Sequence, residues 1–88
     1  MELANKYNLV LHNDDVNDML YVMACLMKYC KHTNLQAEQC VVIADSKGTC
    51  IVKEGAWIDL FDINQELTSL GIKVELKEDE SNLHKPQK

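Results

Sequence analysis

Hydrophobic and polar residues alternate near both ends of the chain, in the pattern of a half-buried strand. Over residues 7–12, tyrosine and two leucines fall on one side of an extended segment, with asparagine, valine and histidine on the other. Over residues 72–77, isoleucine, valine and leucine alternate with lysine and glutamate. Residues 49–52 form a shorter β-branched run. A period of two and β-branched residues are typical of β-strands, so the pattern predicts three strands.

Between these strands, three segments carry apolar residues at steps of three and four, which is the period of an α-helix. The first follows Asn17 and Asp18, either of which would cap its free amide groups. The second begins at Thr33, whose spacing from Gln36 fits a capping box. The third occupies about residues 56–70. The apolar positions expected to face the core are Met19, Val22, Met23, Leu26 and Cys30, then Leu35, Cys40, Val41 and Ala44, then Leu60, Ile63, Leu67 and Leu70.

The element order is therefore β-α-α-β-α-β. It predicts an α+β fold, a two-layer sandwich in which three helices cover one face of a three-stranded antiparallel sheet. We assign residues 1–77 to a single domain, since a chain of 88 residues is too short for two independent cores. Residues 78–88 carry almost no apolar side chains, and we expect them to form a disordered tail.

The chain is acidic and contains no arginine. Its 14 acidic residues outnumber nine basic residues, all of them lysine, for a net charge of −5. Arginine is the preferred bidentate partner of phosphate, and a negative chain is repelled by nucleic acids and anionic lipids. We therefore expect neither a nucleic-acid nor a membrane partner. Because the start of the chain does not resemble a signal peptide and no apolar run could span a bilayer, we expect a cytoplasmic protein.

The cysteines and histidines give little support for catalysis or metal binding. Cys25, Cys30 and Cys40 fall within predicted helices, and no cysteine pair has the close spacing typical of zinc sites. We interpret the cysteines as core thiols, with metal ligands or disulfides as the alternatives. A metal- or thiol-dependent enzyme built on Cys30 and His32 would need partners that the sequence does not locate. We therefore predict no enzyme activity, no cofactor and no metal.

Residues 13–18, Asn-Asp-Asp-Val-Asn-Asp, form the most unusual stretch of the sequence. Asn13, Asp15 and Asn17 imitate the first three ligands of a calcium loop. However, Asp18 and Ala24 stand where such a loop needs glycine and glutamate, which excludes calcium. Two interpretations stay open. The stretch is either a strand-to-helix turn whose side chains bond their own backbone, or an anionic rim that receives a cation.

The first predicted helix is rich in methionine. Met19, Met23 and Met27 lie on one side of it, because they are four residues apart. Ordinary core filling is one interpretation, and an adaptable apolar pocket is the other. Since Met19 follows the polar stretch directly, the second interpretation places an apolar pocket beside anionic oxygens. Such a site suits a ligand with an amine and an apolar side chain.

The segment from Tyr7 to Met19 closely resembles the first strand and turn of the ClpS family, the adaptors of the Clp protease. The family's hallmark there is Asn-Asp-Asp followed four positions later by methionine, which Asn13-Asp14-Asp15 and Met19 match. Residues 37–40 and 47–50, Ala-Glu-Gln-Cys and Lys-Gly-Thr-Cys, resemble its second helix and the strand that follows. The resemblance covers about four-fifths of the chain.

The resemblance implies a non-catalytic adaptor that binds substrates beginning with leucine, phenylalanine, tyrosine or tryptophan and delivers them to a Clp AAA+ unfoldase. The implied partners are substrate N-terminal peptides and the N-terminal domain of an unfoldase of the ClpA or ClpC type, bound by a monomer. By position, the substrate's α-amino group would be bound by Asn13, Asp14, Asp15 and Asp45. Its hydrophobic side chain would lie in a pocket formed by Asn17, Met19, Val22, Val41 and Ala44.

Two departures from the family pattern favour an alternative. Asp45 stands where the family has a histidine that binds the amine, and the family's usual long N-terminal extension corresponds here to about six residues before the first strand. A further departure is Asn17-Asp18, which replaces a Thr-Pro pair. The alternative is a divergent paralogue that docks on the unfoldase N-domain but has lost or altered the pocket, and that modulates substrate choice.

Overall fold

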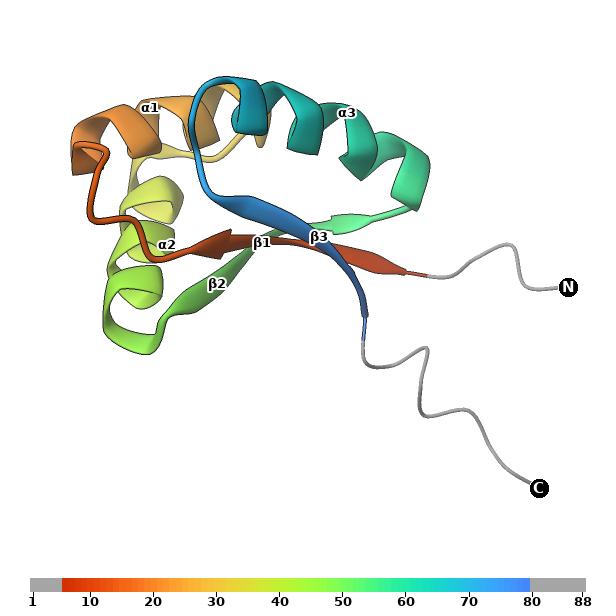
Figure 1. Cartoon of the computed structure of the whole chain (residues 1–88), viewed down its shortest axis with the longest axis horizontal. Coiled ribbons are helices and arrows are strands. Elements are labelled where there is room, and N and C mark those ends of the chain that lie inside the picture. Colours follow the sequence, from red (N-terminus) through yellow and green to blue (C-terminus); the bar gives the residue numbers. More distant parts are fainter. Residues whose placement is uncertain (1–5, 80–88) are drawn as a thin grey trace, which may run out of the picture.

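The computed structural model of the protein describes residues 6–79 and has the predicted element order. The chain forms β1 (Tyr7–His12), α1 (Met19–Tyr29), α2 (Asn34–Lys47), β2 (Thr49–Gly55), α3 (Trp57–Ser69) and β3 (Val74–Glu78) (Figure 1). The predicted α+β fold is thus confirmed. β3 continues to Glu78, and residues 80–88, for which we expected a disordered tail, lie outside the described residues.

The three strands form an antiparallel sheet in the order β2-β1-β3. β1 is therefore the central strand, and its residue Leu11 is paired with Cys50 of β2 on one side and Val74 of β3 on the other. Figure 1 shows α1 and α3 next to each other on one side of the sheet, with α2 at the end where β1 finishes. The loop that leaves β1 therefore starts beside α2 and leads to the first turn of α1 (Figure 1).

The core lies between the sheet and the helices. Its largest fully buried side chains are Leu9, Leu11, Leu26, Leu60 and Leu67, from β1, α1 and α3. Burying each leucine contributes about 1.5–3 kcal/mol relative to leaving it in water. Five of the six elements thus meet in one apolar cluster once Ala37 and Ala44 of α2 and Val52 of β2 are added.

The buried face of α2 differs from the predicted one. Leu35, expected in the core, is 60% exposed, whereas Ala37 and Ala44 are buried. Small side chains let a helix approach its neighbours closely, so α2 packs through its alanines and leaves the larger residue of its first turn in solvent. Cys40 and Val41, also expected inside, are partly buried against the core.

The two predicted helix caps have different outcomes. The capping box of α2 is confirmed: the Gln36 N–H donates to Thr33 Oγ1 at 3.1 Å, and the Thr33 N–H donates to Gln36 Oε1 at 2.8 Å. Asp18 occupies the N-cap position of α1, but its side chain makes no capping hydrogen bond, and neither does that of Asn17. The expected side-chain cap of α1 is therefore wrong. The amide group of Asn17 instead donates hydrogen bonds to Asp14 in the same loop and to the Gly71 carbonyl in the turn after α3.

The central strand is buried more completely than its alternation predicts. Asn8 and Val10 lie on the face of the sheet that the helices do not cover, yet they are only 8% and 7% exposed. Both have a neighbouring strand on each side, so the side chains of β2 and β3 cover them. Residues of a central strand are therefore less exposed to solvent than those of an edge strand.

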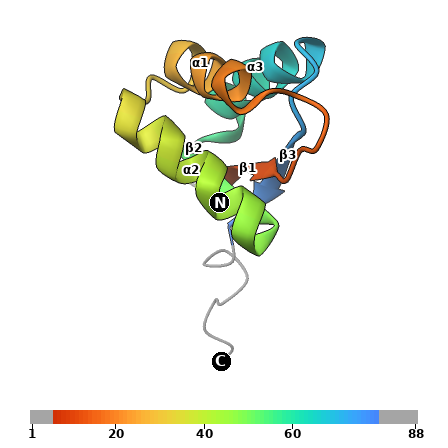
Figure 2. The ribbon, with the colours of Figure 1, turned by 90° about the vertical axis from the view of Figure 1, so that its left-hand side faces the viewer.

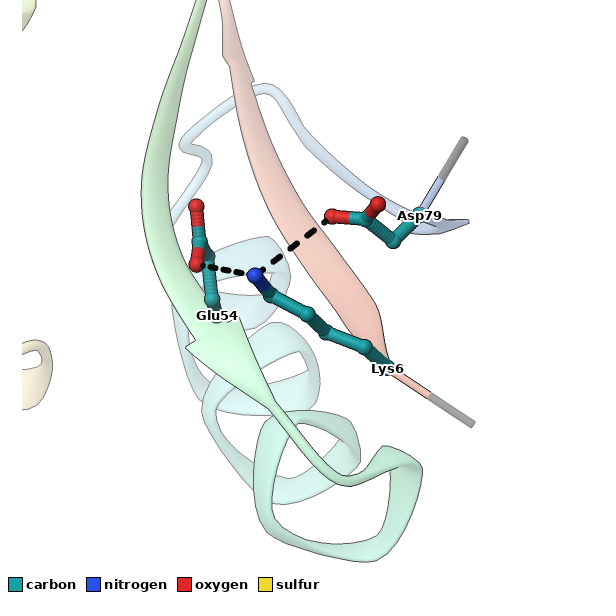
Figure 3. Close-up of polar contacts among 3 residues, drawn as sticks. All are labelled: Lys6, Glu54 and Asp79. Atoms are coloured by element: carbon teal, nitrogen blue, oxygen red, sulfur yellow. Dashed lines mark ion pairs between the residues drawn. The ribbon is translucent and has the colours of Figure 1, made fainter. Parts of the chain in front are cut away.

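Lys6, directly before β1, contacts acidic residues at the end of β2 and directly after β3. Its Nζ lies 2.8 Å from Glu54 Oε1 and 3.9 Å from Asp79 Oδ2 (Figure 3). The Asp79 N–H also donates to the Lys6 carbonyl at 2.9 Å. The hydrogen bond to Glu54 and its negative charge raise the pKa of Lys6. Because water screens such exposed pairs, they fix the geometry of the strand ends more than they add stability.

Replacing Leu26 with alanine tests the packing of α1 on the core. Leu26 is completely buried, so we expect Leu26→Ala to lower the free energy of unfolding by about 2–5 kcal/mol through lost contacts and the cavity left behind. Urea unfolding followed by circular dichroism measures this loss. Leu20→Ala, in the same helix at a side chain that is 69% exposed, is the matched control and should cost less than about 0.5 kcal/mol. Equal losses for both variants would contradict the assigned face of α1.

Candidate functional site

A cavity of about 260 Å³ opens where β1, the loop after it, α1 and α2 meet. Figure 2 shows this side of the molecule, with α2 and the loop of residues 13–18 toward the viewer. The lining residues come from the end of β1, the loop, the first turns of α1 and the second half of α2. They are Leu11, His12, Asn13, Asp14, Asn17, Met19, Val22, Val41, Val42, Ala44 and Asp45.

The structure brings eight of the nine sequence-predicted site residues to this one cavity. Asp15 is the exception, since its exposed side chain does not line the cavity. Three further lining residues, Leu11, His12 and Val42, were not predicted. Each of the three lies within two positions of a predicted site residue in the sequence. Only the tertiary structure shows that they line the same cavity.

The apolar walls of the cavity come from two helices. Met19 and Val22, one turn apart on α1, face Val41 and Ala44 on α2. Val22 and Ala44 are almost fully buried, whereas Met19 is 40% exposed at the entrance. Met23 lies in the core, and Met27 is exposed. Core filling thus describes Met23, and only Met19 of the three methionines borders the cavity.

The loop of residues 13–18 is held in shape by Asp14. Its Oδ1 accepts hydrogen bonds from the backbone N–H groups of Val16 and Asn17, at 2.8 and 3.0 Å. Its Oδ2 accepts from the Asn17 side-chain amide at 2.6 Å, and that amide also donates to the Gly71 carbonyl at 2.8 Å. Asp14 and Asn17 therefore tie the loop to the turn that precedes β3, as the turn interpretation of this stretch predicts.

These hydrogen bonds stabilise the negative charge of Asp14. Desolvation alone would raise the pKa of its carboxyl group, but the hydrogen bonds from Asn17 and Val16, with the nearby charge of Lys73, outweigh it. The pKa of Asp14 is consequently lowered, and the group is ionised at neutral pH. The cavity rim thus carries a fixed negative charge.

Asn13 and Asp45 approach the cavity from two different elements. The Asn13 N–H donates to the Gly48 carbonyl at 2.9 Å, which continues the pairing between β1 and β2 by one residue. Asp45 lies in the last turns of α2, directly before the end at Gly48. Within residues 6–79, neither side chain has a hydrogen-bond or ion-pair partner. Both are free to accept hydrogen bonds from a ligand.

His12 borders the cavity beside Asn13. Its Nε2 lies 2.8 Å from Glu75 Oε1 on β3, an ion pair when the imidazole is protonated. The preceding backbone is also fixed, because the His12 N–H donates to the Lys73 carbonyl at 2.9 Å. This contact joins the edge of the cavity to β3.

The cysteine that lies beside His32 is Cys40 rather than Cys30, the residue considered from the sequence. All four cysteines are free, and Cys40 Sγ lies 3.9 Å from His32 Nδ1. Burial raises the pKa of Cys30 to about 11 and that of Cys40 to about 12, so both thiols are protonated at neutral pH. Over residues 6–79, no three histidine, cysteine or acidic side chains are grouped to hold a metal ion.

No helix in the described part of the chain is both long and apolar enough to cross a bilayer.

Comparison with known proteins identifies a family and a solved structure to which this chain is similar. The sequence model of the family described as "ATP-dependent Clp protease adaptor protein ClpS" matches residues 2–69. The structure of Agrobacterium tumefaciens ClpS2 bound to L-phenylalaninamide superposes with a TM-score of 0.81 at 17% identity, covering 85% of this chain and 98% of that one. The comparison with curated protein sequences gives no match.

The family match spans most of the chain, including the loop of residues 13–18 and both helices that line the cavity. The structural match shows the same fold over nearly the whole length of the solved chain. The chain therefore belongs to the ClpS family of adaptor proteins of the ATP-dependent Clp protease.

Proposed function

We propose that this protein is a non-catalytic adaptor that binds the free N-terminus of substrates beginning with a bulky hydrophobic residue and delivers them to a Clp AAA+ unfoldase. The observation that carries the proposal is the cavity itself, where free acceptor groups on Asn13 and Asp45 border the apolar walls formed by α1 and α2. Its volume of about 260 Å³ is below the usual range of small-molecule pockets. A space of this size suits one amino-acid side chain.

The chemistry of the cavity matches both parts of an N-terminal residue. An α-ammonium group donates up to three hydrogen bonds, and each bond to a charged partner contributes about 1.5–3 kcal/mol. Asn13 and Asp45 accept these bonds, while the carboxylates of Asp14 and Asp15 add negative charge nearby. Burial of a leucine or phenylalanine side chain against Met19 and its neighbours contributes about 1.5–3 kcal/mol more. An acetylated N-terminus has no ammonium group and loses the first contribution.

The structural relative supports this assignment. Agrobacterium tumefaciens ClpS2 is bound to L-phenylalaninamide, which carries a free α-amine and a bulky apolar side chain. The cavity of the present chain offers acceptors for the first and apolar walls for the second. We extend the same ligand class to this protein, including leucine, tyrosine and tryptophan as first residues.

Delivery requires a second contact, which we assign to the N-terminal domain of an unfoldase of the ClpA or ClpC type. Membership of an adaptor family supports this partner. The adaptor would act as a cytoplasmic monomer, with no catalytic step of its own. We assign no unfoldase-contacting residues.

A second candidate is supported by the rim of the cavity. Asp45 is at the cavity rim, where the family has a histidine. Both carboxylate oxygens of Asp14 already accept hydrogen bonds from residues of the same loop. A paralogue with an altered pocket would still dock on the unfoldase and change substrate choice there. The free acceptors of Asn13 and Asp45, directly beside an apolar cavity, make us prefer the first proposal.

Peptide binding tests the first proposal. A fluorescent leucine-initiated peptide should bind, and its acetylated twin should bind at least about 10-fold more weakly, because one charge-assisted hydrogen bond exceeds about 1.4 kcal/mol. Fluorescence polarisation measures both. Asn13→Ala should weaken binding of the free peptide, whereas Asn34→Ala, at the far end of α2, is the matched control and should not. Equal affinity for the two peptides, or binding of neither, would refute the proposal.

Capture of the unfoldase separates the two candidates. Immobilised protein should retain a ClpA- or ClpC-type unfoldase, identified by mass spectrometry, from a lysate of the native host. Retention together with selective peptide binding supports the adaptor. Retention without peptide binding supports the altered paralogue, and a lysate in which the unfoldase is present but not retained argues against both.

The pH dependence of stability tests the role of Asp14 in shaping the rim. Because the pKa of this carboxyl is lowered in the folded protein, its ionised form contributes stability above the unfolded pKa, near 3.8, that is lost as the pH falls through the folded value. Asp14→Asn should therefore be about 1 kcal/mol less stable at pH 7, and the difference should vanish in strong acid. Urea titrations across this range measure it. A difference between Asp14→Asn and the wild-type protein that stays constant down to strong acid would contradict this role of Asp14.

A further inference from the structure

The outer face of α2 carries three large apolar side chains in solvent. Leu35, Val42 and Ile43 are 60%, 52% and 40% exposed. With Glu38 and Gln39 they line a second, shallow groove along the helix. The other four residues follow Leu35 by three, four, seven and eight positions, so all five side chains lie along one side of the helix.

This stripe has no role in the core of the protein. The core-facing side of α2 is formed by Ala37 and Ala44, which are buried. The exposed stripe lies on a different side of the helix, so α2 is apolar on two faces although only one is covered. Contiguous apolar side chains left in solvent commonly mark binding surfaces.

The groove is continuous with the cavity. Val42 lines both of them, so a chain that leaves the cavity over Val42 arrives directly on the groove. From Val42 back to Leu35 the helix rises about 10 Å, at about 1.5 Å per residue. An extended peptide advances about 3.3 Å per residue, so three of its residues match this length.

We propose that the groove on α2 binds the second to fourth residues of a substrate whose first residue occupies the cavity, and that it selects apolar side chains there. This inference rests on the proposed function. Alternate side chains of this extended segment, those of the substrate's second and fourth residues, would contact Val42, Ile43 and Leu35. Glu38 and Gln39 supply oxygens for backbone N–H groups of the segment, which need acceptors once water is displaced.

Two leucine-initiated peptides of equal length test the inference. One has apolar second to fourth residues, and the other has serine and glycine at these positions. By fluorescence polarisation, the apolar peptide should bind the wild-type protein about 10-fold more tightly, because it buries additional apolar surface. Leu35→Ser and Ile43→Ser should each remove much of this gain without changing the affinity for the serine-glycine peptide. Ile58→Ser, at a comparably exposed isoleucine on α3, is the matched control and should change neither affinity.

The outcomes distinguish failure of the groove from failure of the cavity. If both peptides bind equally well, or if the gain persists in Leu35→Ser and Ile43→Ser, the groove inference is wrong and the proposed function stands. If neither peptide binds, both are wrong. Sedimentation velocity of the wild-type protein is the further check: a dimer that Ile43→Ser dissociates would identify the groove as a contact between copies and overturn the inference.

Discussion

The hydrogen bonding of β1 to β2 on one side and β3 on the other is the interaction on which the rest of the structure depends. It places the strand with the fully buried Leu9 beneath the helices and covers the opposite side of the strand as well. It also fixes where the strand ends. The His12 N–H donates to the Lys73 carbonyl, directly before β3, and the Asn13 N–H donates to the Gly48 carbonyl, directly before β2. The start of the loop is therefore held between the beginnings of the two neighbouring strands.

The loop that follows is ordered by its own hydrogen bonds and also forms part of the cavity rim. Asp14 uses its carboxylate to order the backbone up to Asn17, and Asn17 extends this order to the Gly71 carbonyl. The same carboxylate contributes negative charge to the cavity rim. A residue bound in this way makes a rigid rim, which lowers the entropy cost of binding a ligand. Side chains without such partners, Asn13 and Asp45, are then left for direct contact.

The alanines of α2 link the packing of the helix to the shape of the cavity. A small side chain at Ala44 lets α2 lie near the core and at the same time leaves space between α1 and α2. Larger apolar residues of α2 are then directed elsewhere: Val41 into the cavity wall, Leu35 and Ile43 to the outer groove. Close packing on one face, and a cavity and a groove on the others, are thus consequences of one distribution of side-chain sizes.

The sequence by itself determined the order and type of the elements, because periods of two and 3.6 and the Thr33–Gln36 capping box are local signals. The resemblance of the Asn13-Asp14-Asp15 stretch and Met19 to the ClpS family also indicated most of the cavity residues, including those on α2, which lie far from this stretch in sequence. Only the tertiary structure decided that Leu35 lies in solvent, that Val42 borders two surfaces, and that Asp14 bonds its own loop while Asp15 does not line the cavity. Helical periodicity gives an apolar stripe but not the neighbour that covers it, and that neighbour is set by contacts between residues far apart in the chain.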